Sequence, residues 1–315
     1  MNDEAPGRVA VILPCYNEAA SISSVVRSFK EALPKADIFV FDNASTDDTA
    51  RVAREAGADV RSVRLKGKGN VVRRMFADVD ADVYLMADGD GTYDAGKAGA
   101  LVGKVRDEGL DMVVGSRVSE DAAAYRMGHR FGNLLLTRFT GFLFGSTFTD
   151  MLSGYRAFSR RYAKSFPANA AGFEIETELT VHALQLRMPV MEVPTRYGAR
   201  QEGSVSKLNT WRDGFRVLLT IITLFKSERP LAFFSLGFAA CTVTAVALAV
   251  PIFQFYLETG LVPRVPTALL CTGLVLLGVI LLACGLVLDT VTHGRIEAKR
   301  FAYLAVPGPM AGKAR

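Results

Sequence analysis

The chain has 315 residues, half of which are hydrophobic, and its formal net charge is +5. This apolar content excludes an intrinsically disordered chain, because disorder requires low hydrophobicity. Cys15 is the only cysteine in the first 240 residues, which excludes a disulfide framework or a multi-cysteine zinc site in that part. We therefore expect a protein that folds around a hydrophobic core.

Short apolar runs alternate with helical patterns through the first 115 residues. This alternation is typical of an α/β fold, a mostly parallel sheet with crossover helices. The pattern predicts strands at 9–13, 38–41, 60–63, 83–87 and 112–115, and helices at 18–33, 49–56, 70–79 and 94–106.

Polar side chains follow these strands at the points where the strands end. In open α/β sheets, ligands bind outside the carboxyl ends of the strands. The segments concerned are 14–18, 42–45, 66–70 and 88–90. A polar rim of this kind suits a nucleotide. No Gly-x-Gly-x-x-Gly follows the first strand and no P-loop motif occurs, so the dinucleotide and P-loop interpretations lose their main support.

Two aspartates, Asp88 and Asp90, flank Gly89 directly after an apolar strand. Mg²⁺ and Mn²⁺ prefer oxygen ligands and are often held by one or two carboxylates together with substrate phosphates. The pair therefore suits a metal ion that bridges a nucleotide diphosphate. The alternative is an Asp/Gly turn between strand and helix. The acidic strand end at Asp42 favours the metal site.

Six segments resemble a known family when taken in their order along the chain. They are VILPCYNE (11–18), DNASTD (42–47), GKG (67–69), DGDGTYD (88–94), VGSR (114–117) and TDMLSGYR (149–156). The order resembles glycosyltransferase family 2, in particular its dolichol-phosphate mannosyltransferase and polyprenyl-phosphate glycosyltransferase branch. The likeness covers residues 8–215, and some members also carry a two-span carboxyl-terminal hairpin.

The resemblance implies a GT-A fold, a nucleotide-sugar donor, Mg²⁺ or Mn²⁺ as cofactor, and inversion at the anomeric carbon. Asp88 and Asp90 would hold the metal. Many relatives have Asp-Ala-Asp where this chain has Asp-Gly-Asp, which leaves both carboxylates in place. The residues implied to bind the nucleotide sugar are Pro14, Tyr16, Asn17, Glu18, Asp42, Lys68, Asp88, Gly89 and Asp90.

Two later segments, 122–149 and 211–225, combine Arg with Leu and Phe. A basic, aromatic-rich amphipathic helix is typical of the membrane interface. Either helix could instead pack within the protein core.

A basic loop, 200–207, lies between these two segments. From residue 196 to residue 229, seven Lys or Arg stand against three Asp or Glu. Arg binds phosphate through two N–H groups and Lys as a point charge, so Arg200, Ser206 and Lys207 could hold the acceptor phosphate, the donor diphosphate or both in turn. We expect them, with Arg117 from the VGSR segment, to bind the acceptor phosphate. The family's Arg-x-x-Gly-x-Ser-Lys loop is one or two residues shorter, so the register is open. The alternative is a juxtamembrane loop that attracts anionic lipids.

We expect catalysis to depend mainly on positioning and charge. A phosphate monoester has a second pKa near ~6, so a lipid phosphate is largely dianionic and a strong general base is optional. Arg156 would help to hold the phosphates. Asp150 and Glu176 are the carboxylates expected to orient the reactants.

Two apolar segments near the carboxyl end, 231–257 and 265–288, contain no Asp, Glu, Lys or Arg. Each exceeds the ~20 residues that a membrane-spanning helix needs, which predicts a transmembrane hairpin. Two buried core helices are the alternative. Basic residues flank the outer ends of both segments, so the catalytic domain is expected in the cytoplasm. Residues 1–7 are acidic and lack a signal-peptide pattern.

The resulting domain prediction has four parts. Residues 1–208 form a cytoplasmic GT-A domain, 209–228 a juxtamembrane helix, 229–290 two transmembrane helices and 291–315 a cytoplasmic tail. We expect a protein of the bacterial inner membrane.

The predicted function is inverting transfer of a hexose from a UDP- or GDP-sugar to an undecaprenyl- or dolichyl-type phosphate. Alternatives are a non-catalytic membrane adaptor and a transferase for another lipid or glycan. A processive polysaccharide synthase is disfavoured because no Gln-x-x-Arg-Trp motif occurs, and a transporter because the apolar segments carry no ionisable carboxylate or amine. No nucleic-acid partner is expected. The sugar, the lipid length and any homo-oligomer stay open.

Overall fold

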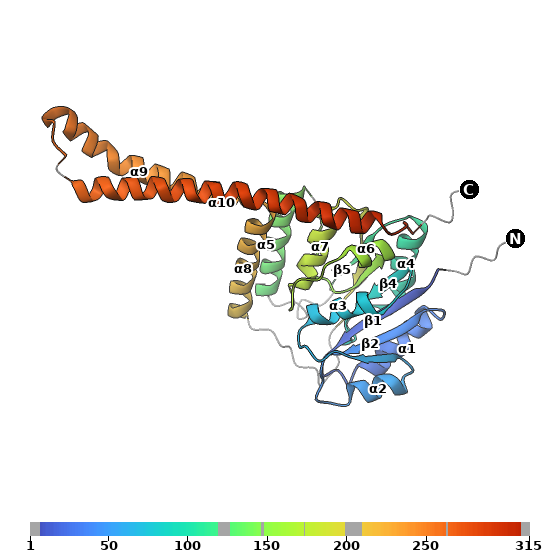
Figure 1. Cartoon of the computed structure of the whole chain (residues 1–315). Coiled ribbons are helices and arrows are strands. Elements are labelled where there is room, and N and C mark those ends of the chain that lie inside the picture. Colours follow the sequence, from blue (N-terminus) through green and yellow to red (C-terminus); the bar gives the residue numbers. More distant parts are fainter. Residues whose placement is uncertain are drawn as a thin grey trace. The chain divides into compact units, whose positions relative to one another are not determined.

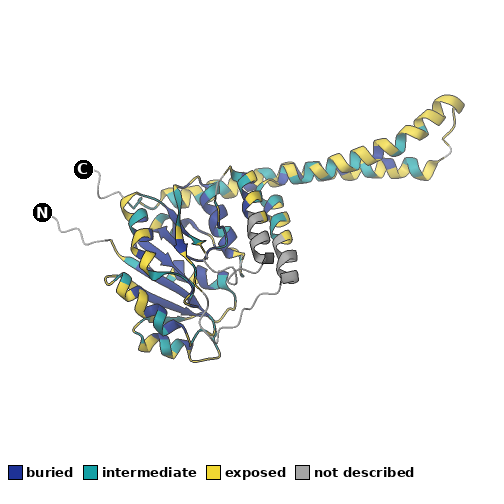
Figure 2. Ribbon diagram, turned by 180° about the vertical axis from the view of Figure 1, so that it is seen from behind, coloured by how far each residue is buried: buried dark blue, intermediate teal, exposed yellow. Residues whose placement is uncertain are grey.

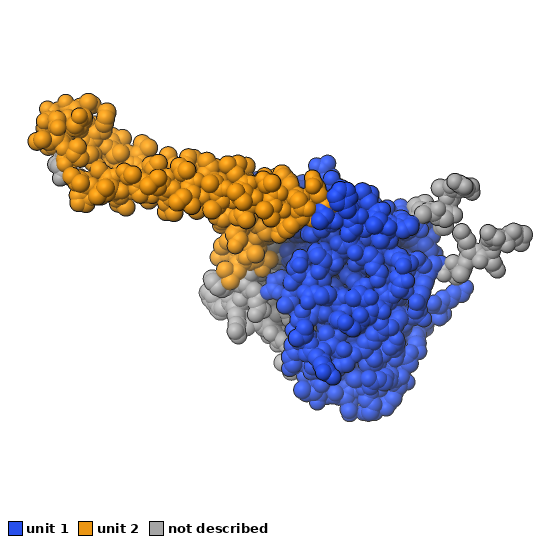
Figure 3. Space-filling model, in the orientation of Figure 1, with its two compact units in different colours: residues 1–217, 298–315 blue, residues 218–297 orange. Residues whose placement is uncertain are grey.

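The computed structural model describes residues 7–118, 127–145, 148–172, 174–198, 210–262 and 264–309. The chain forms two compact units, which Figure 3 colours separately. Unit 1 comprises residues 1–217 and 298–315, and unit 2 comprises residues 218–297.

Unit 1 is built on a mixed sheet that has seven strands in the described part of the chain (Figure 1). Neighbouring strands are parallel except around β6, which runs antiparallel to both β4 and β5. The five predicted strands are present, and the order is β3-β2-β1-β4-β6-β5-β7. The strands are β1 (Val9–Cys15), β2 (Asp37–Asp42), β3 (Asp59–Ser62), β4 (Val83–Met86), β5 (Met112–Val118), β6 (Arg156–Ser159) and β7 (Val190–Arg196).

The helices of unit 1 follow the predicted alternation in its first half. α1 begins at Ile22 rather than at Glu18, because residues 18–21 form a turn in which Ser21 N donates to Glu18 O at 3.1 Å. The segment predicted as one helix over 94–106 is a short 3-10 helix followed by α4. The helices are α1 (Ile22–Ala32), α2 (Thr49–Glu55), α3 (Lys68–Asp78), η1 (Ala95–Lys97), α4 (Ala98–Asp107), α5 (Met127–Phe144), α6 (Arg160–Ser165) and α7 (Ile175–Gln185).

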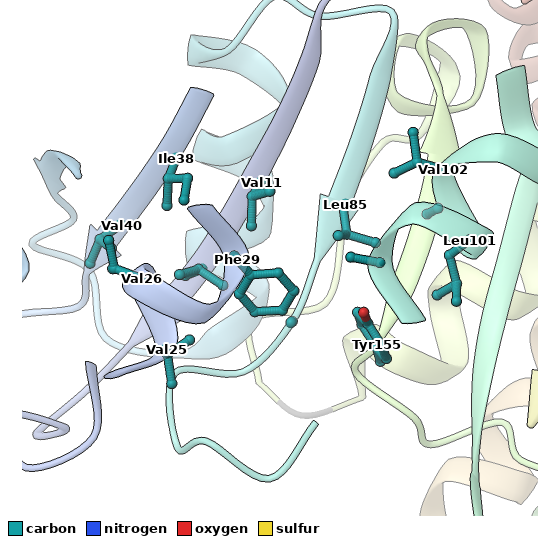
Figure 4. Packing of buried hydrophobic residues seen from close by; sticks show 14 of the residues in the cluster. Val11, Val25, Val26, Phe29, Ile38, Val40, Leu85, Leu101, Val102 and Tyr155 are labelled. Atoms are coloured by element: carbon teal, nitrogen blue, oxygen red, sulfur yellow. The ribbon is translucent and has the colours of Figure 1, made fainter. Parts of the chain in front are cut away.

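Side chains alternate between the two faces of the central strands, as the pleat of a strand requires. Val11 and Leu85 face α1 and α4, and Figure 4 shows Phe29 of α1 in this layer. On the opposite face, Tyr84 of β4 packs edge to face against Phe76 of α3, with ring centroids 5.7 Å apart. Both faces are covered, so these strands are buried (Figure 2), which explains their continuous apolar sequence.

The strand directions bring the predicted site segments to one edge. β1, β2, β4, β5 and β7 all end at this edge, and the antiparallel β6 begins there. Residues that follow the parallel strands therefore meet residues that precede β6.

α5 has two different faces among its described side chains. Phe142 is 81% and Leu135 is 42% exposed, whereas Thr140 and Leu143 are buried. Apolar side chains therefore remain exposed on one face of the helix, which is not enclosed in the core. α8 (Thr210–Glu228) corresponds to the second predicted amphipathic segment.

Unit 2 contains two helices long and apolar enough to be candidate membrane spans, α9 (Pro230–Thr259) and α10, which runs over Val265–Leu304. In the most apolar 18-residue stretch of each helix, only 6% of the residues of α9 and 11% of those of α10 are buried. The two helices are therefore not core helices in the described structure. The buried residues of α10 recur every seven positions, and a Cβ at Gly285 would lie 3.0 Å from Phe234. Small residues of this kind let two helices pack closely.

The last part of α10 belongs to unit 1 and falls within residues 291–315, which were predicted as a cytoplasmic tail. The helix continues past the apolar stretch to Leu304, and Tyr303 donates to Asp111 at 2.8 Å. Asp111 is fully buried and also binds Arg161 through Nε at 2.6 Å and Nη2 at 2.8 Å. Lys299 donates to Gln185 at 2.7 Å. Lys299 and Tyr303 thus bind residues of unit 1, although the residues of this segment are half-buried or exposed.

Candidate active site

Acidic side chains gather at the carboxyl edge of β2 and β4, on either side of β1. Asp42 ends β2 and is 8% exposed, and Asp90 follows β4 and is 6% exposed. Burial raises the pKa of the Cys15 thiol at the end of β1, and nearby carboxylates, including Asp88 and Asp42, raise it further. Within the described residues, the buried Oδ1 of Asp42 has no hydrogen-bond partner. A buried acceptor of this kind suits a ligand with a donor group.

The Asp-Gly-Asp segment is fixed by contacts with its neighbours. The Oδ1 atom of Asp90 accepts hydrogen bonds from Thr92 N at 3.2 Å and from Thr92 Oγ1 at 2.7 Å. A Cβ at Gly89 would lie 2.5 Å from Cys15 Sγ and would also overlap the carboxylate of Glu18. Glycine therefore allows the tips of β1 and β4 to approach. A side chain at position 89 would force Cys15 Sγ or the Glu18 carboxylate to move.

Lys68 joins two carboxylates from different elements. Its Nζ lies 2.5 Å from Asp88 Oδ1 and 2.7 Å from Glu176 Oε1. Lys68 begins α3 and Glu176 lies in the first turn of α7, so two helices meet the strand end here. Burial lowers the pKa of Lys68, but the two carboxylates outweigh this effect and raise it above the usual value. The ammonium group therefore stays charged at neutral pH.

Most, but not all, of the residues at the end of β1 that were predicted to bind the nucleotide lie at the carboxyl edge of the sheet. The Nζ atom of Lys66 lies over the ring of Tyr16, 5.2 Å from the ring centroid. The backbone N–H of Glu18 donates to Thr49 Oγ1 at 2.8 Å. Asn17 N donates to Ser45 Oγ at 2.9 Å, which ties the β1 loop to the β2 loop. Pro14 is different: it lies inside β1, buried, and pairs with Phe41. These side chains other than Pro14 stand at the edge where a ligand would bind.

The loop after β2 contains backbone strain at Ala44. Its φ is 56°, in the left-handed region that costs an L-residue about 1 kcal/mol or more. We expect Ala44→Gly to raise the thermal unfolding midpoint of the detergent-solubilised chain by about 1–3 °C, because glycine adopts this conformation freely. Ala44→Val should lower the midpoint by a similar or larger amount. A lower midpoint for the glycine variant would contradict this account.

Arg117 and Asp150 form a two-pronged ion pair at the same edge. Arg117, at the end of β5, donates from Nε and Nη2 to Asp150, both at 2.7 Å. Asp150 precedes β6, and its backbone N–H is held by Glu192 of β7 at 3.0 Å. The guanidinium of Arg117 lies over the ring of Tyr197, 5.6 Å from the centroid. The pair uses two of the five N–H groups of arginine, a geometry typical of carboxylate and phosphate recognition.

This ion pair should make stability depend on pH. Burial raises the pKa of Asp150, but hydrogen bonds and charge from Arg117 outweigh burial and lower it below its usual value. The stabilisation is then complete above the unfolded-state pKa of about 3.9 and is lost as pH falls through the lower native pKa. We expect Asp150→Asn to lower the unfolding midpoint by about 5 °C at pH 7. The difference from wild type should shrink toward pH 3. A difference that stays constant from pH 7 to pH 3 would contradict the assignment.

Arg156 does not reach the edge where it was expected to hold phosphate. Its side chain is fully buried, and Nε donates to Ser153 O at 2.8 Å while Nη1 donates to Thr180 Oγ1 at 2.8 Å. Nη2 donates to Met151 O. Burial lowers the pKa of Arg156 below its usual value. The guanidinium therefore supports the loop after Asp150 from within.

Arg200, Ser206 and Lys207 lie outside the described residues. The described chain leads up to them at Gly198, whose N–H donates to Thr92 O at 2.9 Å, two residues after Asp90. Tyr197 forms an isolated bridge with Tyr93, and their ring centroids lie 5.5 Å apart. The segment before the basic loop is thus attached to the acidic loop.

The acidic edge fits a divalent metal that also binds substrate oxygens. No group of three or more His, Cys, Asp or Glu side chains able to hold a metal occurs among the residues that the structure describes. Asp88 and Asp90 offer two carboxylates, and Mg²⁺ in particular is commonly bound by one or two carboxylates plus substrate phosphates. The site therefore fits a metal that arrives with a diphosphate better than a metal held by the protein alone.

Three contributors to this edge were missed by the sequence analysis. Tyr93 and Gly154 stand within the quoted segments, and Gly154 N donates to the Tyr93 hydroxyl at 2.8 Å. A Cβ at Gly154 would lie 2.8 Å from Asp88 Oδ2, so this glycine permits the close approach. Glu192 lies in no recognisable motif, and its contact with the loop before β6 depends on tertiary structure.

Comparisons with known proteins agree with this geometry. Residues 10–166 match the family model described as Glycosyl transferase family 2. Glycosyltransferase AglJ of Haloferax volcanii is 35% identical over 304 residues, which cover 95% of this chain and 99% of AglJ. Polyprenol monophosphomannose synthase of Mycolicibacterium smegmatis is 29% identical, with 64% of this chain and 81% of the synthase covered.

A solved structure is also similar. It is glucosyl-3-phosphoglycerate synthase of Mycobacterium tuberculosis in complex with Mn²⁺, UDP and phosphoglyceric acid. The TM-score is 0.57 at 26% identity, and the match covers 70% of this chain and 78% of that one.

Proposed function

Because the chain belongs to glycosyltransferase family 2, we propose that it transfers one hexose from a nucleotide-diphosphate sugar to a polyprenyl phosphate, with inversion at the anomeric carbon. Membership confirms the resemblance of the six segments and the expected GT-A fold. The acceptor class is supported by relatives named for it, including the polyprenol monophosphomannose synthase. A donor with UDP and a divalent ion is supported by the similar structure that contains Mn²⁺ and UDP.

One observation carries the proposal: charged groups suited to two different phosphates meet at one sheet edge. One group consists of Asp88 and Asp90, which follow β4, and Lys68, which begins α3. The other group consists of Arg117, at the end of β5, and Asp150, which precedes β6. A sugar transfer between a diphosphate and a phosphate requires both anions to be held near each other. Cationic and metal-binding groups reduce their repulsion.

The residues would divide the work as follows. Asp88 and Asp90 would hold the metal, which when bound supplies charge stabilisation to the departing diphosphate. Lys68 would bind a diphosphate oxygen as a point charge, and Arg117 would bind the acceptor phosphate. Asp150 orients the guanidinium of Arg117 through the two bonds at 2.7 Å and is a positioning residue. We retain Arg200, Ser206 and Lys207 as proposed acceptor-phosphate ligands.

We also propose that the reaction occurs at the cytoplasmic face of a membrane. The support is the pair of apolar helices, the basic residues Lys226 and Arg229 that precede them, and the exposed Phe142 and Leu135 of α5. Basic residues concentrate on the cytoplasmic side of membrane proteins. Exposed apolar side chains on an amphipathic helix suit the lipid interface, where the hydrocarbon tail of the acceptor resides.

The test uses the full chain in detergent with UDP- or GDP-hexoses, Mn²⁺ or Mg²⁺, and two matched acceptors. One acceptor is undecaprenyl phosphate and the other is undecaprenol, which lacks the phosphate. We expect turnover with the phosphate and none with the alcohol, and we expect EDTA to abolish turnover. Equal transfer to both acceptors would contradict recognition of an acceptor phosphate, and full turnover in EDTA would remove the metal from the proposal.

A further inference from the structure

Lys68 is placed as a cation within the acidic site rather than beside it. Its Nζ contacts both Asp88 and Glu176, and the side chains of Lys68 and Glu176 are 11% and 6% exposed. Asp88 is the more open of the two carboxylates, at 28% exposed. The backbone of Gly154 packs against both Lys68 and Asp88, because a Cβ there would lie 3.1 Å from Nζ and 2.8 Å from Asp88 Oδ2. The three charges are therefore held in a confined space.

A divalent ion that binds Asp88 must share this space with the ammonium of Lys68. Two positive charges at short distance repel each other strongly where water is partly excluded. They also compete for Asp88 Oδ1, the oxygen that Lys68 contacts at 2.5 Å. Metal binding should therefore be weak as long as Lys68 stays on Asp88.

A nucleoside diphosphate changes this balance because it supplies oxygens for both cations. Lysine binds phosphate as a point charge on a flexible four-carbon stem, so its ammonium can move to a diphosphate oxygen. Glu176 remains a partner for Lys68 when Asp88 turns to the metal. Its Oε2 atom is buried and has no hydrogen-bond partner among the described residues, so it can accept a bond from the displaced ammonium.

We propose that Lys68 is a resident counter-cation of Asp88 that the donor diphosphate draws away, so that the metal ion and the diphosphate bind cooperatively. This inference rests on the donor half of the proposed function and requires nothing of the acceptor. It assigns Lys68 two partners in turn, Asp88 in the free protein and a diphosphate oxygen in the loaded site. It also makes Glu176 a positioning residue for Lys68.

The experiment measures Mn²⁺ binding directly, by the electron paramagnetic resonance signal of free Mn²⁺, with the full chain in detergent. Mn²⁺ is titrated alone, with saturating UDP and with saturating GDP. The ratio of the Kd without nucleotide to the Kd with nucleotide is the coupling. We expect a coupling of about 10-fold to 100-fold in the wild type for at least one nucleotide.

Lys68→Met should tighten Mn²⁺ binding in the absence of nucleotide by about 10-fold and reduce the coupling to about 3-fold or less. The matched control is Lys66→Met, which removes the same charge two residues away, beside Tyr16 rather than Asp88. Its Kd for Mn²⁺ alone should stay within about 2-fold of wild type, since exposed charges are strongly screened. Glu176→Gln leaves Lys68 paired with Asp88 only, so Mn²⁺ should bind more weakly when no nucleotide is present.

The inference is overturned if Lys68→Met binds Mn²⁺ alone no more tightly than wild type and keeps the full coupling. It is also overturned if wild type shows no coupling with either nucleotide. If Lys68→Met does not fold, the sign of the Glu176→Gln effect decides: tighter Mn²⁺ binding in that variant contradicts the account. If the chain transfers sugar to undecaprenyl phosphate but shows no coupling between Mn²⁺ and nucleotide, this inference is wrong and the proposed function stands. If Mn²⁺ and nucleotide bind with coupling but no sugar is transferred to undecaprenyl phosphate, the proposed acceptor is wrong and this inference stands.

Discussion

Asp88→Asn is expected to lower kcat for sugar transfer by about 10³-fold. The amide removes one negative charge from the proposed metal site and weakens the contact that Asp88 makes with Lys68 at 2.5 Å. Loss of a single group that stabilises developing charge commonly costs about 10²-fold to 10³-fold, and loss of the metal adds to that cost. The measurement is kcat with saturating donor, acceptor and Mn²⁺. A second measurement at ten times the Mn²⁺ concentration separates weak metal binding from lost chemistry.

Asp94→Asn is the matched control for this prediction. Asp94 belongs to the same DGDGTYD segment, but its Oδ1 accepts a bond from Gly96 N at 2.9 Å and caps the short helix η1. We expect its loss to change kcat by less than about 3-fold, since a capping bond contributes only about 1 kcal/mol to stability. Near-normal turnover of Asp88→Asn at saturating Mn²⁺ would contradict the proposed role of Asp88.

Arg156→Met is expected to lower the thermal unfolding midpoint by about 10 °C. The side chain is fully buried, and its loss leaves Ser153 O, Met151 O and Thr180 Oγ1 without the donor they now share. Buried acceptors without partners cost about 1–3 kcal/mol each, although relaxation recovers part of that. About 3 kcal/mol in total corresponds to about 10 °C in a domain of this size. The measurement is a thermal melt of the detergent-solubilised variant.

This prediction separates a supporting role from a substrate contact. Arg160→Met is the control, because Arg160 is 44% exposed and its partner Asp80 is also exposed. A surface substitution of this kind is expected to change the midpoint by about 1 °C or less. If Arg156→Met instead kept its midpoint and lost only acceptor affinity, Arg156 would contact the phosphate as the sequence had suggested.

The sequence predicted the sheet and its acidic edge because both depend on local patterns. The apolar run 83–87 indicated a strand buried on both faces, and that strand ends beside Asp88. Parallel strands that end at one edge bring Asp42 and Asp88 together whatever the details of the helices. The likeness of six segments to a family then supplied the fold.

Contacts between distant segments could not be predicted in this way. β6 pairs antiparallel with β4 and β5, and its four residues, RAFS, show too short a pattern to predict a strand or its direction. Lys68 meets Glu176 only because α3 and α7 cover the same face of the sheet, and nothing in their sequence spacing records that meeting. The same holds for Tyr303 and Asp111, which lie 192 residues apart and are joined by a hydrogen bond.

The most direct test of the proposed function is the identity of the lipid product. The full chain is incubated with undecaprenyl phosphate, Mn²⁺ and each nucleotide hexose in turn, and the lipid fraction is analysed by mass spectrometry and NMR. The account predicts a polyprenyl-phosphate hexose with one sugar and with the anomeric configuration opposite to that of the donor. A product that retains the donor configuration, or sugar released only as free hexose, would contradict it.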